Sequence, residues 1–324
     1  MADELDLLRR ANPVPADDPL TADGPLDQHA ERTLNRLLHD PHPGRRHRYT
    51  RPAWGLAACA VVLATALTVL LGGTGTTPAV AAPRPLAVRP HSTAVPLDRL
   101  AALAAAAAAD GSPELRKGTH VQSWSLGMSD DKPPVTLPEE RIVRWHADDS
   151  RTEIVVATDP RHPGRPVLTD EDGAPHQVAD GQVLSHRTYP PSWSDAPPEA
   201  PPPHDAGHLR AYLAETARTD SPTTPELLDA VNELLDHWTL GARESAALVR
   251  LLADIPGLRA VGQVTDRLGR PGQAYVYDTD GTRRMLVLDP ATGAVLGTEI
   301  TFSEDQSEYG VMAGDVMEYS AWMR

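Results

Sequence analysis

The chain has 324 residues, enough for two average domains or for one large domain with appendages. Its formal net charge of −15 argues against a surface that binds nucleic acid or an anionic membrane. Aromatic residues make up 4% of the chain, so a core must be built mainly from Ala, Leu and Val. Cys59 is the sole cysteine, which excludes zinc sites and redox centres that need two cysteines.

Residues 1–52 carry eight arginines and nine acidic residues. Acid-first, base-last ordering predicts a short helix at 3–10, and helical spacing predicts another at 26–39. The stretch between them, residues 12–25, is rich in Pro and Asp. Because such a segment cannot bury a core, we expect a flexible tail or a segment that folds against a partner.

Residues 53–73 contain no charged residue and match the ~20 apolar residues that a membrane-spanning helix needs. Arginines at 45, 46, 48 and 51 precede this span, and the next charge is Arg84. The bias predicts a single transmembrane helix in the lipid bilayer, a cytoplasmic N-terminus and an extracytoplasmic C-terminal domain. The alternatives are a buried soluble helix, which rarely runs so long, and a signal peptide cleaved near Ala81, which would need a much shorter leader.

Residues 74–96 are rich in Pro, Ala and Thr, which is typical of an extended stalk. The exported domain is expected at 97–324, beginning with a helix over 97–109. Alternating hydrophobicity then predicts strands at 119–128, 141–147 and 151–158, and a weaker hairpin around the turn Asp170–Gly173. The proline-rich stretch 190–203 is expected to be a surface loop.

Three helices are expected next. The first follows the N-cap candidate Asp205, the second is opened by Thr224-Pro225 and closed by Gly241, and the third stops at Pro256-Gly257. The second carries an apolar stripe of Leu228, Val231, Leu235 and Trp238. Alternation then predicts a meander at 258–266, 272–278, 285–289 and 294–302, and a last strand at 311–319. The fold class is therefore α+β.

The sequence contains no phosphate-binding glycine loop, H-E-x-x-H or G-x-S-x-G motif, and we predict no catalytic residue and no cofactor. Asp170–Gly173 and Asp278–Gly281 lack oxygen ligands at both ends of a calcium loop, so hairpin turns are expected there. His204 and His208 have metal-ligand spacing, but His204 precedes the helix that holds His208. The two would not share a helical face, and no metal site is predicted.

Three tryptophans are the candidates for a ligand-lining surface. Trp124 and Trp145 lie on neighbouring predicted strands, and Trp238 belongs to the stripe of the second helix. They either line an apolar ligand pocket or fill the core under the helices.

The opening residues 3–10 (D-E-L-D-L-L-R-R), the Arg-flanked span and the runs at 251–257 and 289–293 resemble a family of uncharacterised actinobacterial single-pass membrane proteins. The order of strands, helices and a four-strand meander is similar to the lipoprotein-carrier half-barrel of the LolA and RseB type. That resemblance implies a curved antiparallel sheet with helices in its concavity, which binds acyl chains or exported peptides through its shape. It implies no particular functional residue.

The expected topology also resembles membrane-bound anti-sigma regulators, although the zinc element H-x-x-x-C-x-x-C of many of them is absent. We therefore expect a non-enzymatic, membrane-tethered sensor or binding protein. It would bind an apolar or peptide ligand outside and, through residues 1–50, a regulator such as a sigma factor inside. The alternatives are an envelope lipid-handling or structural module with a passive tail, and a hydrolase that uses carboxylates in no recognisable pair.

Overall fold

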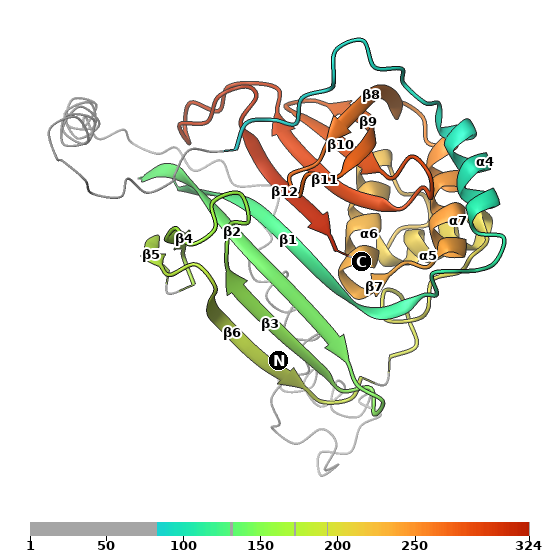
Figure 1. Cartoon of the computed structure of the whole chain (residues 1–324), viewed down its shortest axis with the longest axis horizontal. Helices are drawn as coiled ribbons and strands as arrows, with labels where there is room; N and C mark the ends of the chain where they lie inside the picture. Colours follow the sequence, from blue (N-terminus) through green and yellow to red (C-terminus); the bar gives the residue numbers. More distant parts are fainter. Residues whose placement is uncertain (1–82, 130–131, 172, 193, 324) are drawn as a thin grey trace, which may run out of the picture. The chain divides into compact units, whose positions relative to one another are not determined.

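The computed structural model describes residues 83–129, 132–171, 173–192 and 194–323. The predicted cytoplasmic segment, the transmembrane helix and the first part of the stalk, residues 1–82, lie outside the described residues. Among the residues that are described, no helix is long and apolar enough to cross a membrane. These residues form an α+β fold with a large curved antiparallel sheet and four helices (Figure 1).

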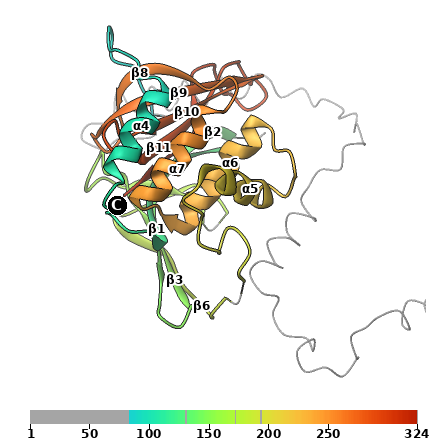
Figure 2. The same ribbon diagram turned by 90° about the vertical axis from the view of Figure 1, so that its right-hand side faces the viewer.

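The helices lie where the sequence predicts them and gather on one face of the large sheet (Figure 2). Asp205 caps the first of the three central helices, since its carboxylate accepts a hydrogen bond from the His208 amide at 3.0 Å. The next opens at Thr224-Pro225 as predicted, and the residue before it, Thr223, is the N-cap and forms a capping box with Glu226. The bounds are α4 Leu97–Ala107, α5 Ala206–Thr216, α6 Thr224–His237 and α7 Ala242–Ala253.

The predicted end of α6 is wrong. At Trp238 the backbone turns extended (φ −130°, ψ 134°), and Trp238–Thr239 forms the short strand β7 against β1. Gly241 therefore does not close α6 but is the N-cap of α7. A tertiary contact ends the helix here, because pairing with Lys117 draws Trp238 out of the helical stripe.

The large sheet runs in the order β6-β3-β2-β1-β12-β11-β10-β9-β8, and β7 pairs with β1 off this path. Its strands are β1 Arg116–Ser129, β2 Lys132–Trp145, β3 Arg151–Ala157, β6 Gln182–Tyr189, β8 Arg259–Thr265, β9 Pro271–Thr279, β10 Thr282–Leu288, β11 Val295–Phe302 and β12 Val316–Trp322. The hairpin β4 Val167–Thr169 with β5 His176–Val178 forms a separate two-stranded sheet.

The strand predictions are confirmed for β3, for the β4–β5 hairpin and for the meander from β8 to β11. The last strand starts later than we expected, since Val311 makes an isolated bridge to Gln306 before β12 begins at Val316. β2 starts nine residues before the predicted strand. Pro138 lies inside it without breaking the ladder, because its carbonyl faces Thr158, just beyond the last β3 residue, and its nitrogen points to that same side.

Strand β6 has no counterpart in the predictions. Its exposure pattern explains why, since the adjacent side chains of His186, Arg187 and Thr188 are all exposed. Neighbouring residues of a strand point to opposite faces, so neither face of this part of β6 is covered. Such a strand shows no apolar–polar alternation.

The sheet is packed on both faces. The helix face carries the main core, which joins all four helices to Val121, Tyr275, Leu286 and Trp322 of the strands. The opposite face carries two smaller clusters, one on β8–β11 and one around Trp124 and Tyr319. Residues 83–96, here called the strap, cover this opposite face through Leu86 and Val88. The packed domain therefore begins before Leu97, the start that we expected.

The strap also covers the β8 edge of the sheet. The Arg89 amide donates to the Gln263 carbonyl at 2.7 Å, and the Gln263 amide donates to Ser92 Oγ at 2.9 Å. Gly262 makes this approach close, because a side chain there would meet Ser92 Oγ at 2.6 Å and its φ is +129°. The other edge strand of the sheet is β6.

Candidate functional site

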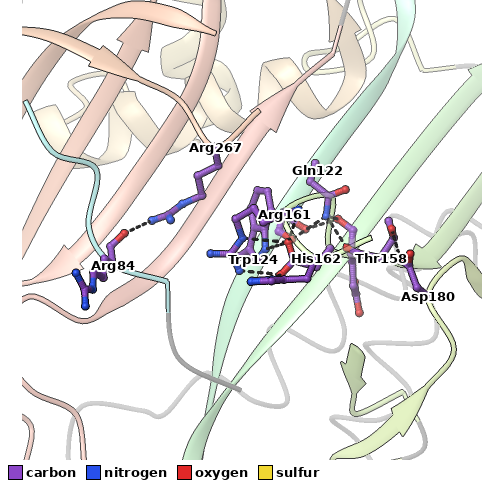
Figure 3. A network of polar contacts seen from close by, with 11 residues as sticks. Arg84, Gln122, Trp124, Thr158, Arg161, His162, Asp180 and Arg267 are labelled. Carbon is purple, nitrogen blue, oxygen red and sulfur yellow. Dashed lines mark hydrogen bonds and ion pairs between the residues drawn. The ribbon is translucent and has the colours of Figure 1, made fainter. Parts of the chain in front are cut away.

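Trp124, the first predicted ligand-lining residue, is 1% exposed and lies on the face opposite the helices, where it packs against Tyr319 with ring centroids 5.4 Å apart. Its indole nitrogen lies 3.3 Å from Asp159 Oδ1. Arg161 binds both oxygens of the same carboxylate and stacks over the Trp124 ring, as Figure 3 shows. These contacts hold the loop after β3 against β1, which is a structural role.

Gln122 and Asp180 extend the same network (Figure 3). The Gln122 amide donates to the carbonyls of Glu139 and Thr158, at 3.0 and 2.9 Å. Asp180 accepts bonds from the Thr158 hydroxyl and the Gly164 amide, and these bonds hold the pKa of its carboxyl below the ordinary value. Every strong polar group named here has a partner within the loop or the strands.

Trp145 lies at the far end of β2, between cations. The Lys117 ammonium is 3.7 Å from the centre of its ring, and the Arg151 guanidinium is 5.2 Å away. Arg151 also stacks on Tyr189 at 4.5 Å and approaches Glu199 of the proline-rich loop at 3.8 Å. This arrangement fastens that loop to the end of the sheet.

Trp238 belongs to the main core on the helix face, and its indole donates to the Pro198 carbonyl at 2.8 Å. Trp124 and Trp238 therefore lie on opposite faces of the sheet. The structure does not bring the three tryptophans together around one pocket.

The part of the sheet farthest from the helices is formed by β2, β3 and β6, here called the open wing. In Figures 1 and 2 the helices lie over the β8–β12 half, and the open wing extends beyond them. Residues directly opposite each other in the ladders share a face. Arg141 is opposite Val121 of the main core, so the helix face of the wing carries Arg141, Glu153 and Arg187.

A group of charged side chains lies where α6 meets this wing. Glu233 and Asp236 are three residues apart, and so lie on one side of α6. The charges of Arg141 on β2 and Glu318 on β12 act on the Asp236 carboxyl. These four residues are here called the α6 charge cluster. One turn before it, Asp229 pairs with Arg284 of β10, with Nη2 and Oδ2 3.3 Å apart.

Two carboxyls of the α6 charge cluster, those of Asp236 and Glu318, have raised pKa values. Burial raises the pKa of Asp236 to about 6, with help from Glu318 and Glu233 and against the opposing influence of Arg141 and the Trp322 indole. Burial also raises the pKa of Glu318, and the nearby Asp229 adds to this effect. Groups with such displaced pKa values concentrate at functional sites, and the charge of this cluster changes within the physiological pH range.

Sequence reasoning missed the α6 charge cluster. The sequence does show acidic residues at 229, 233 and 236, a spacing that places them on one side of a helix. That pattern is normally a solvated face. The partners Arg141 and Glu318 come from strands far away in the sequence, and nothing in their local patterns indicates the meeting.

Two cavities border these elements. A pocket between α6 and β10–β11, lined by Leu228, Asn232 and Ile300 among others, has a volume of about 10 Å³, which is space for at most one water molecule. A hollow of about 360 Å³ lies at the start of β1, lined by Pro113, Glu114, Arg116, Thr239 and Leu240. Within the described residues, no group of three or more His, Cys, Asp or Glu side chains is arranged to hold a metal ion.

Comparisons with known proteins leave the family open. No protein-family model matches the chain, and no curated protein matches it. Among solved structures, the chain shows a slight similarity to the dehydratase domain from the CurF module of curacin polyketide synthase. The two are 12% identical over 72% of this chain and 84% of that one, with a TM-score of 0.13. The corresponding CurK domain is 11% identical, covers 72% and 82%, and also has a TM-score of 0.13. Similarity at this level carries no argument about function.

Proposed function

We propose that the chain is a membrane-tethered extracytoplasmic sensor or binding protein, non-enzymatic, which binds a peptide on the open wing. The observation that carries this proposal is the uneven cover of the sheet. Helices and the strap bury the β8–β12 half on both faces, whereas β6 is exposed on both faces at His186, Arg187 and Thr188. A curved sheet with helices packed on one face supports the half-barrel reading. Fold alone does not fix function, so the chemistry of the wing must decide the ligand.

The chemistry favours a peptide over an acyl chain. The space beneath α6 next to β10 and β11 is close to filled, at about 10 Å³. The helix face of the wing carries Arg141 and Glu153, which are paired and partly buried, and the exposed Arg187 at its outer edge. An acyl chain placed there would strip water from charged groups at high cost. A peptide can instead satisfy such groups with its backbone and its own charges.

The proposed tether is the apolar span at residues 53–73, and residues 1–50 are proposed to contact a cytoplasmic regulator such as a sigma factor. Support comes from the sequence, through the arginine-flanked span and the Pro/Asp-rich segment before it. Co-purification of a sigma factor with residues 1–50 would support signalling. Its absence, with a ligand bound outside, would favour the envelope module with a passive tail.

Native mass spectrometry of the full chain, released from its own membrane in mild detergent, tests the ligand class. The expected result is an adduct that fragments as a peptide and that is lost when Arg187 and Thr188 are changed to Glu and Pro. An adduct of acyl-lipid mass would support the lipid-handling alternative. A chain free of any adduct, and unresponsive to peptide libraries, would contradict the proposal.

A further inference from the structure

The two edges of the large sheet are treated differently by the fold. The β8 edge is capped by the strap through Arg89 and Ser92. At the β6 edge, Ser185–Thr188 make no backbone hydrogen bond with any described residue beyond the ladder with β3. Exposed edge strands pair readily with another chain unless charged side chains (above all Lys), Pro, a bulge or a short length prevents it. β6 is eight residues long and contains neither Lys nor Pro.

Two protective features are present, the exposed charge of Arg187 and a bulge that is confined to one end. The register between β3 and β6 shifts between Val155 and Val156, which leaves Leu184 as the extra residue of a bulge. From Ser185 to Tyr189 the pairing with β3 is regular. This stretch therefore presents an extended, regular and uncovered edge.

The helix-face side chains form a row of alternating charge that ends at this edge. Arg141 of β2 bonds Glu153 of β3, with Nε and Oε1 2.7 Å apart. Glu153 is directly opposite Arg187 of β6, which is exposed. The charges thus alternate cation, anion, cation across three strands, with Arg141 reaching Glu153 diagonally because Val143 is the residue directly opposite Glu153. A carboxylate is the group that would continue it on a further strand, since opposite charges on adjacent strands stabilise the pair.

The other face of the same edge has a different character. Ile142, Ile154 and His186 are directly opposite one another in successive strands, and both isoleucines are half-buried. A further strand would extend this row with an apolar or β-branched side chain. An incoming strand that fits both rows must alternate apolar and acidic residues.

Charge balance over the wing agrees with this pattern. β2, β3 and β6 together carry five Lys and Arg residues against three Glu, whereas residues 53–324 carry 22 Lys and Arg against 36 Asp and Glu. The carboxylates of the α6 charge cluster belong to α6 and β12, and its residue nearest the wing edge, Arg141, is on β2. A strand added beyond β6 is therefore roughly 15 Å or more from the cluster. That distance exceeds the Debye length of about 8 Å at physiological salt.

We propose that the edge of β6 at Ser185–Tyr189 binds an extended peptide segment of alternating apolar and acidic residues, which adds as a further strand and pairs a carboxylate with Arg187. This inference rests on the proposed peptide-binding function and names its docking edge and the ligand chemistry. Backbone hydrogen bonds would supply affinity, and the two side-chain rows would supply selectivity. A second copy of this chain is the competing occupant, and the test below separates it.

The test uses the full chain in phosphatidylcholine nanodiscs and two blocked heptapeptides, Val-Glu-Val-Glu-Val-Glu-Val and its Lys counterpart. Fluorescence anisotropy should show the Glu peptide binding about tenfold more tightly than the Lys peptide. Arg187→Glu should invert that preference, whereas Arg210→Glu, an equal charge change on α5, should leave it unchanged. Hydrogen exchange should show new protection of the β6 amides. Two N-methylated forms of the peptide are compared, each methylated at one of the two alternating sets of backbone nitrogens. Methylation of the set that bonds β6 should abolish binding, and methylation of the other set should not.

Equal binding of the two peptides, or a preference that Arg187→Glu does not invert, would overturn the inference. Protection near Asp236 and Arg141 without protection of β6 would also overturn it, while leaving the proposed peptide-binding function standing. Binding of neither peptide, together with no peptide adduct in native mass spectrometry, would contradict both this inference and the proposed peptide-binding function. Protection of β6 that rises with protein concentration, without added peptide, would assign the edge to a second copy.

Discussion

The buried ion pair beneath the strap offers a quantitative test of how this domain is held together. Arg267 and Glu299 pair with side chains only 6% and 2% exposed. Glu299 also accepts a bond from the Leu86 amide at 2.8 Å, and Arg267 donates to the Arg84 carbonyl at 3.0 Å (Figure 3). Burial raises the pKa of Glu299 even with Arg267 beside it, so the attraction does not offset the loss of hydration.

Replacing one partner should therefore cost far more than replacing both. Glu299→Leu leaves the Arg267 guanidinium buried without its anion, and we expect a loss of about 3–5 kcal/mol in the free energy of unfolding. For a domain of this size that corresponds to a fall of roughly 6–20 °C in Tm. Combining Glu299→Leu with Arg267→Met should recover most of the loss, because two apolar side chains can fill the same volume.

The assay is thermal unfolding of the full chain in nanodiscs, with hydrogen exchange read over residues 84–90. The single variant should unfold earlier and expose the strap, because Leu86 loses its acceptor. If the double variant is as unstable as the single one, the uncompensated charge of Arg267 is not the cause of the lost stability. A single variant that loses less than about 1 kcal/mol would show that the pair is effectively solvated.

Four further predictions concern the helices, the cluster and the topology. Leu235→Ala removes a 4%-exposed core side chain and should lower the free energy of unfolding in urea by about 2–5 kcal/mol. Its control Val183→Ala, at a 54%-exposed position, should change that free energy by less than about 0.5 kcal/mol. Equal effects would contradict the core assignment. Thr223→Ala removes the α6 capping box and should cost about 1 kcal/mol. Folding raises the pKa of Asp236 to about 6, so the folded state holds this proton more tightly than the unfolded chain. The stability that this proton adds, about 2–3 kcal/mol relative to Asp236→Asn, is present below pH 4 and is lost by pH 7. Parallel stability–pH profiles of the two proteins would refute the shift. A reporter fused after Arg324 should be active only outside the cytoplasm; activity confined to the cytoplasm would overturn the topology.

Local signals predicted most of the helices and the meander, because in those segments periodicity, caps and turns agree with one another. The capped starts of α5 and α6 and the turn glycines Gly269, Gly281 and Gly293, which adopt positive φ, are examples. These features depend on neighbouring residues alone. They can therefore be predicted from the sequence.

The parts that escaped prediction depend on distant residues. Trp238 leaves the helical stripe because it pairs with β1. Pro138 does not disrupt β2 because the side of its backbone that lacks an N–H group faces the end of β3. β6 shows no apolar–polar alternation because His186, Arg187 and Thr188 are exposed on both faces of the sheet. The α6 charge cluster joins residues from β2, α6 and β12, a meeting that only the strand order creates.

The most direct test of the peptide-binding account is site-specific photo-crosslinking in intact cells. A photoreactive residue is placed at Thr188 on the edge of β6, and a matched one at Arg210 on α5, in the full membrane-bound chain. The account predicts peptide crosslinks from position 188, made outside the cytoplasmic membrane and weakened by Arg187→Glu, with a clear excess over position 210. Equal yields from the two positions, or crosslinks from position 188 to lipid alone, would contradict it.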